Sequence, residues 1–231
     1  ECGINGIISY STSREELDKK IALMNNLIIH RGPDSEGKII EDGIALGFRR
    51  LSIIDLSSNG DQPMTSHSGR YTIVFNGEIY NFQALKKNLL RDSKVAFKGT
   101  SDTEVLLHMI EKYGLDKALL DIQGMYAFAL YDRTANKIHL CRDRLGEKPL
   151  YYSLMNQKLY FSSELKPLTN LLKENLSLDI DNINFFVNKS YFPEGHSVFR
   201  EVKKVLPGTF ITFKLNETKV TSSSVSTYWS F

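Results

Sequence analysis

The chain has 231 residues, of which 42% are hydrophobic and 24% charged, so its composition is that of a globular protein with a sizeable core. Its formal net charge is +2 with Lys and Arg spread along the chain, which argues against nucleic acid as a partner. No apolar run approaches the roughly 18 residues of a membrane-spanning helix, and no signal-peptide pattern is seen, so no membrane partner is expected. The two cysteines, Cys2 and Cys141, favour a reducing, cytoplasmic compartment over a disulfide-bonded fold.

Strands and helices alternate in the first half of the chain. Apolar residues at helical spacing predict helices, and two Ser-x-x-Glu capping boxes mark where such helices begin. The Asn76-Gly77 pair is a strong turn signal, because both residues tolerate positive φ, and we expect a strand to end there. In chain order the expected elements are a strand at 3–10, a helix at 14–29, strands at 44–48 and 71–75, and helices at 79–90 and from 101 onward.

The second half is dominated by short strands at hairpin-like spacing. Because these strands cluster without intervening helices, we predict an α+β layered fold of antiparallel sheets with helices outside. The Ser- and Thr-rich stretch 216–231 is expected to be either an edge strand or a linker, and residues 1–215 are assigned to one domain. The expected elements are strands at 125–131, 137–141, 150–153, 159–162 and 208–215, with helical pieces near 165–173 and 181–188.

Five stretches contain more reactive and charged side chains than a structural role requires. Taken singly, each has a structural explanation: a small buried cysteine, a hairpin turn, a helix N-cap at Asp102 or solvated arginines. Their combination is more specific than the parts. They are Cys2-Gly3-Ile4, His30-Arg31-Gly32-Pro33-Asp34, Arg49 to Asp55, Asn76-Gly77-Glu78-Ile79-Tyr80-Asn81 and Gly99 to Glu104.

Together these stretches resemble the amidotransferase domain of glutamine-dependent asparagine synthetases, which are class II, N-terminal-nucleophile glutaminases. The resemblance runs from Cys2 to about Gly208 and includes the Arg-Asp-x-x-Gly-x-x-Pro-Leu-Tyr-Tyr stretch at 142–152. It implies a four-layer αββα sandwich of two antiparallel sheets between helices. It also implies hydrolysis of L-glutamine to L-glutamate, with the ammonia passed to a C-terminal ATP-dependent synthetase domain. A homodimer is a further expected assembly.

The resemblance implies three catalytic residues. Cys2 is the nucleophile, and the side-chain amide of Asn76 and the backbone N–H of Gly77 are the donors to the oxyanion. The chemistry fits, since a primary amide is a poor electrophile that needs a strong nucleophile and preset donors. An N-terminal α-amine, with a pKa of about 7.7–8.0, serves as the base on the same residue as the thiol.

The resemblance also implies a set of substrate-binding residues. Arg50 binds the α-carboxylate of glutamine, which suits a planar guanidinium, and Asp102 binds the α-ammonium. Glu78 and the backbone around Leu51 and Ile53 complete the pocket. His30 is expected to be structural. No cofactor is expected in this domain, and no metal, because the five histidines are scattered without ligand spacing.

Three positions depart from the family pattern. The nucleophilic cysteine of this family becomes residue one when the initiator Met is removed, whereas here Glu1 precedes Cys2. A Cys2 nitrogen within a peptide bond is an amide and cannot act as a base. Either Glu1 stands in for the Met, or it ends a propeptide that is later cut off, or the domain is inactive or ammonia-dependent. Arg49 replaces a common His or acidic residue, and Asp61 a common His.

The ATP-dependent part of the family is not seen in the sequence. The family carries a Ser-Gly-Gly-x-Asp-Ser type ATP-pyrophosphate loop in a following domain, and this chain has no such loop. We therefore expect ATP and Mg to act only in that absent synthetase domain. Its acceptor is aspartate or a different carboxylate. The alternative function is a catalytically inactive glutamine-binding or structural domain of a synthetase-like protein.

Overall fold

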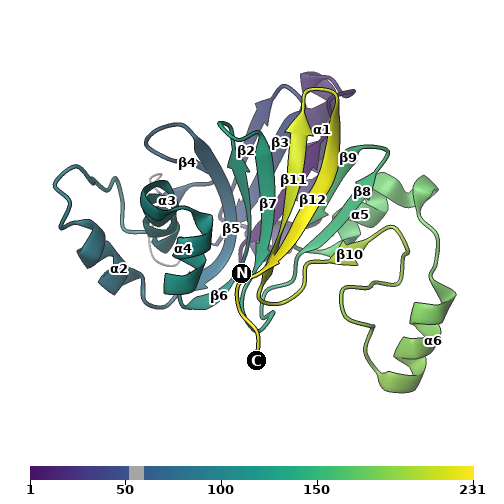
Figure 1. Ribbon diagram of the computed structural model, residues 1–231. Helices are drawn as coiled ribbons and strands as arrows, with labels where there is room; N and C mark the ends of the chain where they lie inside the picture. Colours follow the sequence, from purple (N-terminus) through teal and green to yellow (C-terminus); the bar gives the residue numbers. More distant parts are fainter. Residues whose placement is uncertain (52–59) are drawn as a thin grey trace.

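The computed structural model describes residues 1–51 and 60–231, which build two six-stranded sheets (Figure 1). Neighbouring strands of the first sheet pair antiparallel. Its strands, in spatial order, are β10 (Lys203–Lys204), β8 (Tyr151–Met155), β9 (Lys158–Ser162), β1 (Gly3–Ile8), β3 (Ile44–Arg50) and β2 (Ser35–Glu41). The sheet therefore joins the N-terminal strand to a hairpin from the middle of the chain.

The second sheet also pairs antiparallel throughout. Its spatial order is β12 (Lys219–Thr227), β11 (Thr209–Asn216), β7 (Lys137–Arg142), β6 (Gly124–Asp132), β5 (Tyr71–Ile79) and β4 (Met64–Thr65). Strands β1 and β5 contact each other across the space between the sheets. This contact brings Cys2, which directly precedes β1, toward Asn76 and Gly77 on β5.

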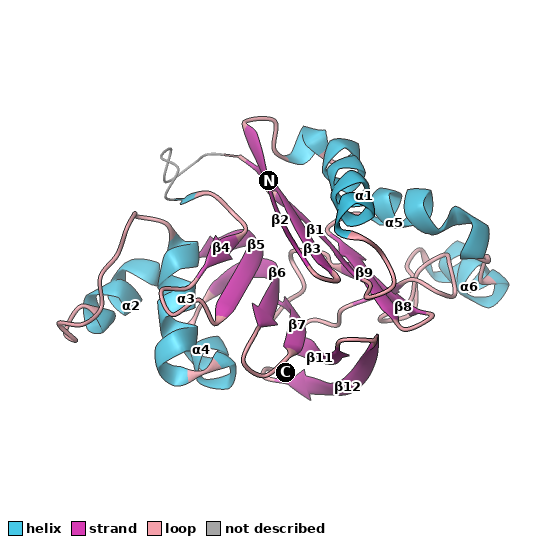
Figure 2. Cartoon of the chain, turned by 90° about the horizontal axis from the view of Figure 1, so that it is seen from above, coloured by secondary structure: helices cyan, strands magenta, loops and turns pink. Residues whose placement is uncertain are grey.

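Helices cover the outer face of each sheet, so the described chain has four layers (Figure 2). Helices α1 (Arg14–Leu27) and α5 (Leu165–Leu172) pack on the first sheet, and α3 (Asp102–Tyr113) packs on β5 of the second. Helices α2 (Phe82–Leu89) and α4 (Leu115–Asp121) pack on α3. Helix α6 (Ile180–Lys189) lies away from the sandwich, and two short 3-10 helices span Ile29–Arg31 and Lys173–Asn175.

Three buried apolar clusters fill the spaces between these layers. The largest side chains between the sheets include Phe48, Phe161 and Phe213, and each such burial stabilises the fold by roughly 1.5–3 kcal/mol. A second cluster lies beneath α3, and a third lies beneath α1 and α5. The predicted α+β fold with an αββα sandwich is confirmed.

Both predicted capping boxes start helices. Ser13 Oγ accepts a hydrogen bond from the Glu16 N–H at 3.2 Å, and Ser101 Oγ accepts one from the Glu104 N–H at 3.3 Å. The Ser101 cap makes Asp102 the first residue of α3, so the interpretation of Asp102 as the N-cap is wrong. Helix α1 ends at Leu27, two residues short of the predicted end at 29.

The predicted turn at Asn76-Gly77 is wrong, because β5 runs through both residues to Ile79. Gly77 has a φ of 143°, and its pairing with Tyr126 of β6 continues on both sides. A Cβ atom on Gly77 would lie 2.1 Å from the Met125 carbonyl oxygen. Glycine thus serves here to bring two backbones close together within a sheet, not to reverse the chain.

The Ser- and Thr-rich stretch forms β12, which is the edge-strand alternative and not the linker. It pairs with β11 from Asn216↔Lys219 to Thr209↔Thr227. Just beyond it, the Tyr228 hydroxyl bonds to the Tyr126 hydroxyl at 2.9 Å and donates to the Arg142 carbonyl. The second sheet therefore continues past residue 215. Among the described helices, none combines the length and the apolar character that crossing a membrane requires.

Candidate functional site

A cavity of about 300 Å³ opens where β1, β3, β5 and α3 come together, and we call it the Cys2 cavity. Its walls contain every predicted site residue that the structure describes, whereas Ile53 lies outside the described residues. The predicted residues that line it are Cys2, Arg50, Leu51, Asn76, Gly77, Glu78 and Asp102. The other lining residues are Glu1, Phe48, Gly60, Gln62, Phe75, Ser101, Thr103, Met125 and Lys148.

Cys2 directly precedes β1, and hydrogen bonds on both sides fix its backbone. Arg31 Nε donates to the Cys2 carbonyl at 3.1 Å, and the N–H of Ile4 donates to Ser163 Oγ at 2.9 Å. The Leu51 N–H points at Cys2 Sγ from 3.5 Å. The thiol therefore has a fixed position at the mouth of the space between the sheets.

Burial raises the pKa of the Cys2 thiol, while the contact with Leu51 and the charge of Arg50 oppose this shift. The thiol is consequently the dominant form near neutral pH, and attack on a carbonyl carbon needs a base beside it. The nitrogen of Cys2 is such a base only as a free amine. In the Glu1–Cys2 peptide bond it is an amide without basicity.

Asn76 carries the clearest unsatisfied donor of the cavity. Its side chain is buried on β5, and its Nδ2 has no hydrogen-bond partner among the described residues. A buried amide N–H without a partner costs about 1–3 kcal/mol, so such groups are rare where they have no ligand. The donor lies beside Gly77, where the backbone approaches closely. The pair has the form of an oxyanion site.

Arg50 ends β3, and the His30 to Asp34 stretch holds its backbone. The Asp34 N–H donates to the Arg50 carbonyl at 3.2 Å, and a Cβ on Gly32 would lie 2.5 Å from the carbonyl carbon of Arg49. The guanidinium reaches into the Cys2 cavity and forms an ion pair with Asp61. His30 lies outside the cavity and bonds to Glu164 at 3.0 Å.

Asp102 lies in the first turn of α3 and also lines the cavity. Its Oδ2 accepts the Ile79 N–H at 2.8 Å, which ties the helix start to the end of β5. Burial raises the pKa of the Asp102 carboxyl, although this hydrogen bond opposes the shift. A buried carboxylate with spare acceptor capacity is suited to an incoming ammonium.

Gln62 is a positioning residue that the sequence analysis missed. Its Oε1 accepts the N–H of Phe75 at 2.5 Å, and its Nε2 donates to Thr103 Oγ1 at 3.3 Å. Phe75 precedes Asn76, and Thr103 follows Asp102. The Gln62 side chain therefore links the segment of the predicted oxyanion donor to the segment of the predicted ammonium ligand. Only the Gln-Pro pair within a polar stretch marks this residue in the sequence.

Lys148 is a second lining residue with no assigned role in the sequence analysis. Its buried ammonium pairs with Glu1 at 2.9 Å, and Arg31 Nη2 reaches the other Glu1 oxygen at 3.1 Å. The Lys148 hydrogen bond and the Arg31 charge lower the pKa of Glu1. Lys148 lies in the Arg142 to Tyr152 stretch, to which the sequence assigns no role beyond its resemblance to a family.

That stretch is a rigid turn built around the buried Asp143 carboxylate. Asp143 accepts N–H groups from Tyr126, Leu145, Glu147 and Lys148 at 2.9–3.2 Å. The Arg142 guanidinium donates to three backbone carbonyls, all at 2.9 Å. The turn therefore fixes the approach of Lys148 to the cavity. The three carbonyls belong to Lys148, Val205 and Gly146.

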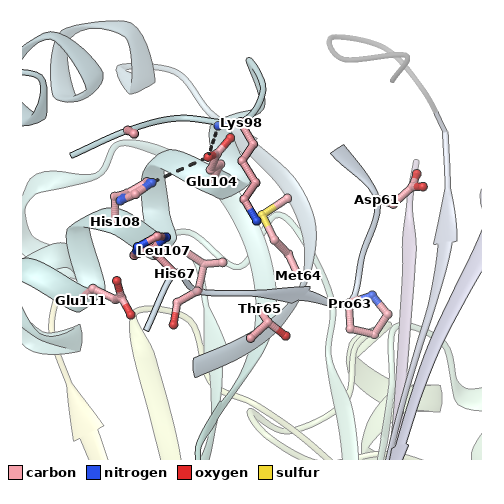
Figure 3. A pocket seen from close by; sticks show the side chains of 12 residues that line it. Asp61, Pro63, Met64, Thr65, His67, Lys98, Glu104, Leu107, His108 and Glu111 are labelled. Carbon is pink, nitrogen blue, oxygen red and sulfur yellow. Dashed lines mark hydrogen bonds and ion pairs between the residues drawn. The ribbon is translucent and has the colours of Figure 1, made fainter. Parts of the chain in front are cut away.

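A second cavity, of about 400 Å³, adjoins the first, and we call it the α3 cavity (Figure 3). Hydrogen bonds within the protein satisfy its carboxylate Glu104, which accepts the N–H of Lys98 at 2.8 Å and of Gly99 at 2.9 Å. The other lining residues are Asp61, Pro63, Met64, Thr65, Ser66, His67, Ala96, Leu107, His108 and Glu111. Nowhere in residues 1–51 and 60–231 do three or more His, Cys, Asp or Glu side chains form a metal-binding group.

Comparison with known proteins identifies the family of the chain. The family model described as "Glutamine amidotransferase domain" matches residues 1–229. The glutamine-hydrolyzing asparagine synthetase 1 of Bacillus subtilis (strain 168) is 37% identical over 218 residues, which are 92% of this chain and 33% of that protein. The protein named "Amidase chry2" of Gibberella zeae is 32% identical over 230 residues, which are 94% of this chain and 33% of that protein. The chain spans about a third of the length of these curated relatives.

A solved structure shows the same fold. The glutamine phosphoribosylpyrophosphate amidotransferase of Bacillus subtilis, complexed with ADP and GMP, superposes with a TM-score of 0.69 at 19% sequence identity. The superposition covers 96% of this chain and 49% of that chain. At this identity the likeness concerns the fold alone.

Proposed function

The chain belongs to the glutamine amidotransferase domain family, and from this we propose that it hydrolyses L-glutamine to L-glutamate and ammonia with Cys2 as the nucleophile. The observation that carries the proposal is the Cys2 cavity. It places a thiol, an unpartnered buried amide donor, a guanidinium and a buried carboxylate in one cavity of about 300 Å³. Glutamine has a complementary group for each of them.

The proposed binding mode follows from charge. The α-carboxylate of glutamine binds the Arg50 guanidinium, and the α-ammonium binds Asp102, whose Oδ2 also accepts the Ile79 N–H. These two contacts direct the side-chain amide of glutamine toward Cys2. Glu78 and the Leu51 backbone are further contacts that the cavity lining supports.

The proposed reaction has two halves. The amine of Cys2 takes the thiol proton, and Sγ attacks the amide carbon, so that the carbonyl oxygen becomes an oxyanion held by Asn76 Nδ2 and the Gly77 N–H. The oxyanion collapses, the C–N bond breaks, and ammonia leaves with the proton that the amine had taken. Water then attacks the thioester by the same route, which releases glutamate and restores the thiol.

The ammonia is proposed to reach an ATP-dependent domain outside this chain. Relatives that are about three times longer and are named glutamine-hydrolyzing asparagine synthetases support aspartate as the acceptor. ATP and Mg are proposed to act in that domain. A different carboxylate acceptor is the second candidate, because a relative that matches 94% of this chain is not named as an asparagine synthetase. The unpaired thiols of Cys2 and Cys141 support a reducing, cytoplasmic compartment.

Covalent labelling with 6-diazo-5-oxo-norleucine tests the proposal. The reagent mimics glutamine and alkylates an active nucleophile, so intact mass should show one adduct on a chain that begins with Cys2. Cys2→Ala should abolish the adduct, and the matched control Cys141→Ala should keep it, because Cys141 is fully buried in the core beneath α3. Absence of labelling in the chain that begins with Cys2 contradicts the proposal. The chain that keeps Glu1 should label slowly or not at all.

A further inference from the structure

We propose that Asp61 sets the affinity for glutamine by competing with the α-carboxylate of the substrate for the Arg50 guanidinium. The inference rests on the proposed function. Arg50 Nη1 forms an ion pair with Asp61 Oδ1. The Arg50 side chain is 9% exposed and the Asp61 side chain 53% exposed. The arginine is therefore a fixed part of the cavity wall, and the aspartate reaches it from the solvent side.

The position of Asp61 allows its side chain to move away from Arg50. Gly60 and Gln62 line the Cys2 cavity, whereas Asp61 lines the α3 cavity on the other side of the same segment. Figure 3 shows the Asp61 carboxylate across this second cavity from Glu104. Gln62 anchors the segment to Phe75, so the Asp61 side chain can turn toward the α3 cavity without moving the wall.

The competition follows from the geometry of the guanidinium. A carboxylate binds arginine most strongly through two parallel hydrogen bonds, and Asp61 occupies Nη1. Glutamine must displace Asp61 or share the guanidinium with it, and sharing places two negative charges side by side. A partly exposed ion pair changes an equilibrium constant by about 1.4- to 5-fold, and glutamine affinity is reduced by this factor.

The test compares the KM of two substrates in a protein that begins with Cys2. Asp61→Asn keeps the size of the side chain and removes its charge, so the KM for L-glutamine should fall about 1.4- to 5-fold. The KM for L-glutamine methyl ester should not change, because the ester has no α-carboxylate. Asp61→Ser should give the same pattern, with thermal unfolding measured to verify that both variants fold.

Asp42→Asn is the matched control. It breaks another Arg–Asp pair, Arg14 Nε to Asp42 Oδ1 at 2.6 Å, which lies outside the Cys2 cavity, and it should leave both KM values unchanged. An unchanged or raised KM for glutamine in active Asp61→Asn protein overturns the inference. An equal fall for both substrates also overturns it, since the effect then does not depend on the carboxylate. Absence of turnover in the unsubstituted protein is distinguishable from these results and defeats the proposed function itself.

Discussion

The Cys2 cavity and the α3 cavity share the segment 60–63 as a common wall. They differ in whether hydrogen bonds within the protein satisfy their polar groups. In the α3 cavity, Glu104 accepts two backbone N–H groups, and Glu111 accepts the backbone N–H of Ser68 at 3.1 Å. In the Cys2 cavity, the Asn76 amide lacks a partner among the described residues. The α3 cavity is the larger of the two, at about 400 Å³ against about 300 Å³. Unsatisfied polar groups, and not volume, therefore indicate where a substrate binds.

The largest effect expected on activity is that of Cys2→Ala. Removal of the thiol removes the atom proposed to form a covalent bond with the substrate, so turnover should fall below detection. Ammonia release from L-glutamine, measured in protein that begins with Cys2, checks this. Residual turnover at more than a trace level would contradict the assignment. Thermal unfolding should remain close to that of the unsubstituted protein, because the Cys2 side chain is only partly buried.

Asn76→Ala should reduce kcat by about 100- to 1000-fold, because one of the two oxyanion donors is lost. The same change removes an unpartnered buried amide, so the free energy of unfolding should stay the same or rise. Steady-state kinetics and urea unfolding measure the two quantities. If both activity and stability fell together, Asn76 would be a structural residue and the difference between the two cavities would disappear.

Asp102→Asn should raise the KM for glutamine about 10- to 100-fold, since a charge-assisted contact to the α-ammonium is lost. The variant should bind glutamine more weakly, yet its free energy of unfolding at pH 7 should be higher. The pKa of Asp102 is raised by burial, so the folded state is stabilised only at low pH, and this contribution is lost as the pH rises through the folded pKa. The variant should thus exceed the unsubstituted protein in unfolding free energy at pH 7, and match it below about pH 3. An unchanged KM would count against the ammonium contact.

Glu104→Ala, in the α3 cavity, should show the smallest effect on activity. Its carboxylate satisfies the N–H groups of Lys98 and Gly99, so its loss should lower the free energy of unfolding by about 1–3 kcal/mol. kcat/KM should change by less than about threefold, because Glu104 does not line the Cys2 cavity. A large loss of glutaminase activity at full stability would mean that the α3 cavity takes part in the reaction.

Local patterns predicted the elements that depend on local physics. The capping serines 13 and 101, and the apolar spacing after them, gave the starts of α1 and α3 because a cap satisfies N–H groups within four residues. The turn expected at Asn76-Gly77 failed because the partner strand β6, some fifty residues further on, holds the chain extended. Strand β2, which has no clear apolar period, and helix α4, which has only 7 residues, were not expected.

The residues of the candidate site could be listed only through their resemblance to a family, because they lie on four separate elements. Which of them face each other is decided by the contact of β1 with β5 and by the placement of α3. Gln62 and Lys148 were missed for the same reason. Each acts on groups more than ten residues away: Gln62 on Phe75, and Lys148 on Glu1. Sequence spacing holds no information on such pairs.

Strand β12 has a consequence for how this domain behaves in solution. It covers β11, whose Phe210, Ile211, Phe213 and Leu215 are buried, and it ends the sheet with Ser, Thr and Lys residues. A chain cut at 215 would leave β11 as a long apolar edge with unpaired backbone groups, which is a template for aggregation. Such a chain should self-associate in light scattering at micromolar concentration, whereas one that extends through Tyr228 should stay dispersed. The polar edge strand β12 thus protects the second sheet from edge-to-edge aggregation.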